Sequence, residues 1–98
     1  MTEVRLTPEA HADVADALEW YEARAPHVVS RFIDDYRALL AQLGENPRLY
    51  PAVRADVRRA GFSDFPYGLF FRIAADGVEV FGCMHAKRDP RRWHRRSQ

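Results

Sequence analysis

The chain has 98 residues, of which 47% are hydrophobic and 30% charged, and its formal net charge at pH 7 is +1. This length fits a single domain spanning residues 1–98, and the single cysteine excludes an intramolecular disulfide and a cysteine-based zinc cluster. The chain has neither the roughly 18-residue apolar run of a membrane span nor a signal peptide, so we expect a cytoplasmic protein with no membrane association.

The first part of the chain predicts a short strand over Val4 to Thr7, followed directly by a helix. Thr7 is suited to cap the first free amides of that helix, and Pro8 is tolerated at its first position. Apolar residues then recur at helical spacing as far as Ala25. The acidic residues between them are expected on the solvent side of this helix: Glu9, Asp13, Asp16 and Glu19.

A second helix follows Pro26, which interrupts the first apolar pattern. Its apolar stripe runs from Val29 to Leu43, and Gly44 is the expected C-terminal cap before Asn46-Pro47. The two helices should therefore form an antiparallel hairpin.

The rest of the chain changes to short β-like runs, which predict three strands: Val57 to Phe62, Tyr67 to Ile73 and Val78 to Ala86. Asp76-Gly77 is a typical hairpin turn between the last two. We therefore expect an α+β fold, in which a strand, the helical hairpin and a three-stranded antiparallel meander form a small sheet packed on two helices. A short basic turn or helix should end the chain.

With Asp76-Gly77 as the two turn residues, the last two strands would divide their side chains between two sheet faces. One face should pack on the helices: Tyr67, Leu69, Phe71, Ile73, Val78, Val80, Gly82 and Met84. The other should remain open and carry the polar groups: Gly68, Phe70, Arg72, Phe81, Cys83, His85 and Lys87.

The charges are divided unequally between the two halves of the chain. Residues 1–50 hold five basic and nine acidic side chains, a net charge of −4, whereas residues 51–98 hold ten and five, a net charge of +5. A basic half of this kind indicates an anionic partner, which can be nucleic acid, an enzyme that handles nucleic acid, or an acidic protein.

The basic half ends in a segment whose residues are suited to hold arginines in place. Asp89-Pro90 starts a turn, and Trp93 can anchor that turn to the edge of the sheet. The residues that this arrangement would present to a target are His85, Lys87, Arg88, Arg91, Arg92 and Trp93.

His85 and Cys83 are the residues nearest to a catalytic pattern. His85, followed by Lys87 and Arg88, fits either a phosphate-binding or acid–base cluster or a strand-end histidine that hydrogen-bonds a backbone carbonyl. Cys83 has no third ligand or orienting carboxylate near it in the sequence, so we interpret it as a buried core thiol. We expect no metal and no cofactor.

Several short motifs together resemble the ParE-type toxins of the RelE/ParE superfamily, which are plasmid-stabilisation proteins of type II toxin–antitoxin systems. The motifs are Glu19-Trp20-Tyr21-Glu22, Arg31-Phe32, Asn46-Pro47, Pro51, Val57-Arg58-Arg59, Phe65-Pro66-Tyr67 and His85-x-x-Arg88-x-Pro90-x-x-Trp93. They cover nearly the whole chain.

The resemblance implies a toxin that inhibits DNA gyrase by binding, without catalysis, and that is neutralised by a cognate antitoxin in a hetero-oligomer. The antitoxin would contact the aromatic residues of the hairpin, Trp20, Tyr21, Phe32 and Tyr36. The RelE branch instead implies an endoribonuclease that cuts messenger RNA on the ribosome, with Arg59, Arg72, His85 and Arg88 as its nearest candidates. A non-toxic module that binds nucleic acid or protein is the third alternative.

Overall fold

The computed structural model describes residues 2–87 and 91–97. The helices are α1 (Pro8–Arg24), α2 (Val29–Glu45) and α3 (Arg91–Arg96), with short 3-10 turns η1 (Pro26–Val28) and η2 (Pro47–Leu49). The strands are β1 (Val4–Leu6), β2 (Ala52–Arg54), β3 (Val57–Gly61), β4 (Tyr67–Ala74) and β5 (Gly77–His85). The predicted α+β class is confirmed. Among the described residues, no helix combines the length and apolarity that crossing a membrane would require.

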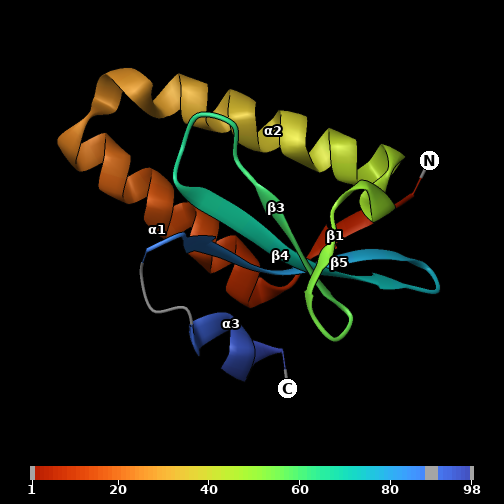
Figure 1. Cartoon of the computed structure of the whole chain (residues 1–98). Helices are drawn as coiled ribbons and strands as arrows, with labels where there is room; N and C mark the ends of the chain where they lie inside the picture. The colour runs from red at the N-terminus through yellow and green to blue at the C-terminus, as the bar shows by residue number, and fades with distance from the viewer. Residues whose placement is uncertain (1, 88–90, 98) are drawn as a thin grey trace.

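The strands form one sheet in the order β1-β5-β4-β3-β2. β3, β4 and β5 make the expected antiparallel meander, whereas β1 lies parallel to β5, with Val4 opposite Val78. β2 was not predicted from the sequence, because its three residues are too few to show a period. Figure 1 shows α1 and α2 on one side of the sheet and α3 on the other.

The start of α1 agrees with the sequence, whereas α2 ends two residues later than predicted. The Thr7 hydroxyl accepts a hydrogen bond from the Ala10 amide at 3.1 Å, so Thr7 is the predicted N-cap. Gly44, by contrast, lies inside α2, and its carbonyl accepts a bond from the Thr2 amide at 2.8 Å. Gly44 therefore fastens α2 to the chain before β1 instead of capping the helix.

The inner face of the sheet, defined here as the face toward α1 and α2, holds the main core. Phe32 of α2 makes edge-on aromatic contacts with Phe65 and Tyr67, at centroid distances of 5.1 and 5.8 Å. The largest fully buried side chains all belong to this core: Phe32, Phe71, Leu43, Leu69, Val78 and Val80.

The outer face, defined as the opposite one, carries a second and smaller apolar cluster. Its buried members are Val57, Phe70, Phe81 and Met84, and Trp93 of α3 packs against them. The outer face is therefore partly covered by α3 and is not the open polar surface that the sequence predicted.

The pairing of β4 with β5 corrects the predicted faces beyond Phe81. Ala74 lies opposite Gly77, so the turn residues are Ala75 and Asp76, not Asp76 and Gly77. That error displaces each pair by two residues, which leaves every side chain on its predicted face. Val78 and Val80 accordingly point inward, as expected.

A bulge in β5 then exchanges the faces. Phe71 lies opposite Val80 but Phe70 lies opposite Gly82, so Phe81 is one extra residue in β5. From Gly82 onward the side chains lie on the opposite face from the one predicted, because a shift of one residue reverses the alternation. Cys83 and His85 therefore lie on the inner face, and Gly82 and Met84 lie on the outer face.

Gly77 supplies the first testable substitution. Its φ angle is +147°, and a Cβ there would lie 2.5 Å from the carbonyl oxygen of Glu3. We expect Gly77→Ala to lower the free energy of unfolding by roughly 2–4 kcal/mol in urea denaturation, because it adds backbone strain and a clash with β1. Gly61→Ala is the control: its Cβ would meet only the flexible end of Arg59, at 3.2 Å. An equal loss from both variants would contradict this account.

Candidate functional site

Helix α3 is held on the outer face by the aromatic ring of Trp93. The ring stacks on Phe70 with a centroid distance of 5.0 Å and an interplanar angle of 17°. His94 lies edge-on to Trp93, and its Nδ1 is 2.9 Å from a guanidinium nitrogen of Arg54 in β2. Trp93 is thus an anchor, as the sequence suggested, but it packs on the face of the sheet and not on its edge.

A buried carboxylate holds the same helix from the other side. Asp13 of α1 has a side chain only 5% exposed, and it accepts bonds from Arg92 at 3.0 Å and from Arg96 at 2.5 Å. Arg96 also donates to the carbonyl of Phe81 at 3.1 Å. Paired and hydrogen-bonded in this way, a buried charge is stable, whereas an unpaired one would be costly.

Asp13 also closes the edge of β5. The parallel ladder with β1 ends where the Thr7 amide donates to the Val80 carbonyl, at 2.9 Å. Beyond that point the amide of Cys83 donates to Asp13 at 3.0 Å, in place of a strand partner. Gly82 lies next to this contact: a Cβ there would lie 2.8 Å from the flexible end of Met84, and at ordinary contact distances of 3.4 Å from Arg96 and 3.7 Å from Asp13.

These contacts divide the basic residues of α3 into two groups. Arg92 and Arg96 both pair with Asp13. The side chain of Arg96 is 22% exposed, and that of Arg92 is 44% exposed. Arg91 and Arg95 are exposed on the surface of the helix. Of the predicted target-binding residues, Arg91 and Arg92 thus lie on one anchored helix with Trp93, whereas Arg88 lies outside the described residues.

His85 lines one pocket together with Asp13, Trp20 and Arg92 of α3. It ends β5 on the inner face, where its ring is 5.3 Å from the ring of Tyr67. Its Nδ1 accepts a bond from the backbone amide of Lys87 at 3.1 Å. His85 thus bonds the backbone at the end of its strand, as in the alternative to an acid–base residue, but its partner is an amide and not the expected carbonyl.

Cys83 is the buried core thiol that the sequence predicted. It is 3% exposed, and burial, with a smaller effect of Asp13, raises the pKa of its thiol to about 12. A thiol in that state is protonated at neutral pH and is a poor nucleophile. No group of three metal-ligating side chains occurs within residues 2–87 and 91–97.

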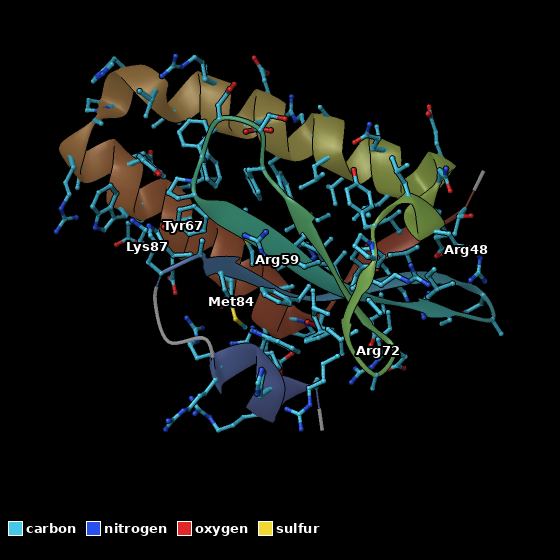
Figure 2. All side chains as sticks on the ribbon, viewed as in Figure 1. Arg48, Arg59, Tyr67, Arg72, Met84 and Lys87 are labelled. Atoms are coloured by element: carbon cyan, nitrogen blue, oxygen red, sulfur yellow. The ribbon has the colours of Figure 1, made fainter. Side chains whose placement is uncertain are left out.

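The structure does not bring together the three ribonuclease candidates that it describes, Arg59, Arg72 and His85. Arg59 and Arg72 lie on the outer face, and His85 lies on the inner one. Arg72 is also five residues along β4 from Tyr67, the partner of His85, a separation of about 17 Å along the strand. Figure 2 shows Arg72 near the β2–β3 turn and Lys87 at the opposite end of the sheet.

The outer-face arginines are engaged with the sheet and its neighbours. Arg72 lies over the ring of Phe81 at 4.9 Å, bonds Asp56 at 3.3 Å and donates to the carbonyl of Ser97. The guanidinium of Arg59 lies directly over Gly68, where a Cβ would come within 2.6 Å of it. Both side chains are therefore placed by packing.

The hairpin aromatics proposed as antitoxin contacts differ in accessibility. Trp20 is 36% exposed and lies beneath the guanidinium of Arg24, at 4.7 Å. Phe32 is fully buried, and Tyr21 and Tyr36 are partly buried against the core. Burial also raises the pKa of the Tyr36 hydroxyl. Only Trp20 among the four therefore offers a partner a large exposed surface.

Sequence reasoning placed Asp13 on the solvent side of α1 and missed its contact with Arg96. The signal was present in the spacing, because Asp13 lies three residues after Ala10 and four before Ala17, within the buried stripe of the helix. An acidic residue inside an apolar stripe predicts a buried cationic partner.

A family model described as the ParE toxin of type II toxin–antitoxin system, parDE, matches residues 4–90. A solved structure described as the chromosomal ParDE toxin–antitoxin system from P. aeruginosa is similar, with a TM-score of 0.77 and 16% identity. The alignment covers 89% of this chain and 98% of that one. At so low a sequence identity, the similarity shows that the two proteins share a fold. No curated protein matches the chain significantly.

The Asp13 contacts predict that one substitution on α1 loosens α3. We expect Asp13→Ala to lower the free energy of unfolding by about 2–4 kcal/mol and to speed tryptic cleavage within α3, because it leaves two guanidinium groups and an edge amide without their acceptor. Asp16→Ala, an exposed carboxylate on the same helix, is the matched control. Identical behaviour of the two variants would show that Asp13 does not hold α3.

Burial of Cys83 predicts slow alkylation. Iodoacetamide at pH 9 should modify the native chain about 10²-fold or more slowly than the urea-unfolded chain, because the pKa of the native thiol is about 12 and the thiolate is the reactive form. Mass spectrometry of the alkylated chain measures both rates. Equal rates would mean that the thiol is accessible and ionised in the folded state.

Proposed function

This chain belongs to the ParE family of toxins from type II toxin–antitoxin systems, and we propose that it inhibits DNA gyrase by binding and is neutralised by a cognate antitoxin. The observation that carries the proposal is the anchored helix α3. It presents exposed arginines on a short helix that is fixed at Trp93 and at Asp13. A fixed cationic surface suits recognition of an anionic enzyme–DNA complex in the cytoplasm.

The alternative, an endoribonuclease of the RelE branch, has less support from the geometry. Acid–base catalysis requires its groups within hydrogen-bond reach of one substrate. Arg59 and Arg72 lie on the opposite face of the sheet from His85. A non-toxic binding module is the outcome if neither activity is found.

The gyrase proposal is tested with purified gyrase and relaxed plasmid. We expect Arg91→Glu with Arg95→Glu to weaken inhibition of supercoiling at least about tenfold, because it reverses the exposed charges of α3 and spares both arginines that bond Asp13. The control, Arg31→Glu with Arg37→Glu, makes the same change in net charge at exposed positions of α2. Its inhibition should stay within about twofold of the unmodified chain.

Two further measurements separate the alternatives in the same experiments. His85→Ala should leave inhibition unchanged, whereas loss of an acid–base residue costs about 10²-fold or more in rate. Trp93→Ala should weaken inhibition without removing a charge, since α3 would lose its aromatic anchor on Phe70. Messenger RNA cleavage with unaffected supercoiling would move the assignment to the RelE branch.

A further inference from the structure

The two edges of the sheet differ in how they are protected. At the β1 edge, the chain before the strand is bonded to α2 through the Thr2 amide and the Gly44 carbonyl. At the other edge, β2 pairs with β3 on one side, and no described strand pairs with it on the other. Figure 1 shows this light-green segment descending from the end of α2 at the front of the molecule.

The segment around β2 exposes apolar side chains at this free edge. Leu49 is 59% exposed and Val53 is 46% exposed, and among the described residues only Trp20 joins them as an exposed large hydrophobic. Tyr50, which lies between them, contacts Phe71 of the core at 6.1 Å, and its carbonyl accepts a bond from Arg58. The contacts of Tyr50 hold the segment against the core, whereas the side chains of Leu49 and Val53 remain exposed to solvent. Exposed apolar side chains beside an unpaired strand edge are typical of an interaction site.

The same segment is strongly basic. Residues 48–59 contain four arginines and one aspartate, a net charge of +3. The aspartate, Asp56, already bonds Arg72, at 3.3 Å. Arg48 and Arg54 are exposed beside the two apolar residues. An occupant of this edge should therefore carry carboxylates as well as apolar side chains.

We propose that the β2 edge binds an extended acidic peptide segment as an additional strand, with apolar side chains over Leu49 and Val53 and carboxylates near Arg48 and Arg54. The proposal rests on the proposed function, because the segment would belong to the antitoxin. Backbone groups at a free strand edge pair with another backbone, and exposed leucine and valine do not complement phosphate, so a peptide fits this edge better than nucleic acid.

A second copy of the chain fits the edge less well. Two identical β2 edges related by a two-fold axis would place the arginines of both copies at one interface, where like charges repel. An acidic peptide instead neutralises them. Arg54 also contacts His94 of α3, so an occupant that engages Arg54 reaches the helix that we propose to act on the target.

The test uses the full chain and, as probe, the purified protein encoded by the gene next to this one. We expect Leu49→Glu with Val53→Glu to raise the dissociation constant about 10²-fold, on the order of tenfold for each lost apolar contact. His27→Glu with Ser30→Glu adds the same charge at exposed positions near the tip of the helical hairpin and should bind like the unmodified chain. Both variants should keep the thermal midpoint of the unmodified chain, because all four side chains are exposed.

Hydrogen exchange of the complex identifies the mode of binding. An added strand should slow exchange of backbone amides in residues 52–54 relative to the free chain. Unaltered binding by the Leu49/Val53 variant, or no protection of β2, would overturn this inference and leave the antitoxin itself intact. A homodimer lost in that variant would assign the edge to a second copy. Absence of any complex with the unmodified chain would overturn the proposed neutralisation, and this inference with it.

Discussion

The buried carboxylate of Asp13 is the contact on which the arrangement of this molecule depends. It belongs to the first helix, bonds an amide of the last strand and accepts bonds from two arginines of the C-terminal helix. Because its side chain is only 5% exposed, losing these donors would leave a charge in the interior. One residue therefore couples the helical hairpin, the edge of the sheet and the helix proposed to act on the target.

The bulge at Phe81 gives the two faces of the sheet their different contents. One extra residue in β5 places Phe81, Gly82 and Met84 toward α3, while Cys83 and His85 turn toward α1 and α2. The thiol and the imidazole are thereby separated from the outer-face arginines. This separation is one reason why we propose a binding function for this protein.

The contacts that anchor α3 also explain how so short a helix can be stable. Six residues are too few for a helix to be stable in isolation, so α3 depends on tertiary contacts. Stacking of Trp93 on Phe70 supplies the apolar contact, and the Asp13 pairs supply the polar one. At the far side of the sheet, the Arg54–His94 contact links the same helix to β2, whose free edge is where we place the partner strand.

The sequence by itself determined the elements whose signals are local. Thr7 and Pro8 mark the start of α1, and the helical spacing of apolar residues predicts the two helices of the hairpin. The short β-like runs predict β3, β4 and β5. These signals can be read from the sequence because capping and periodicity involve neighbouring residues. The tertiary structure alone decided the parallel pairing of β1 with β5, the short strand β2 and the bulge at Phe81, because these depend on contacts between distant segments. It also decided that Asp13 is buried, since its arginine partners are roughly 80 residues away along the chain.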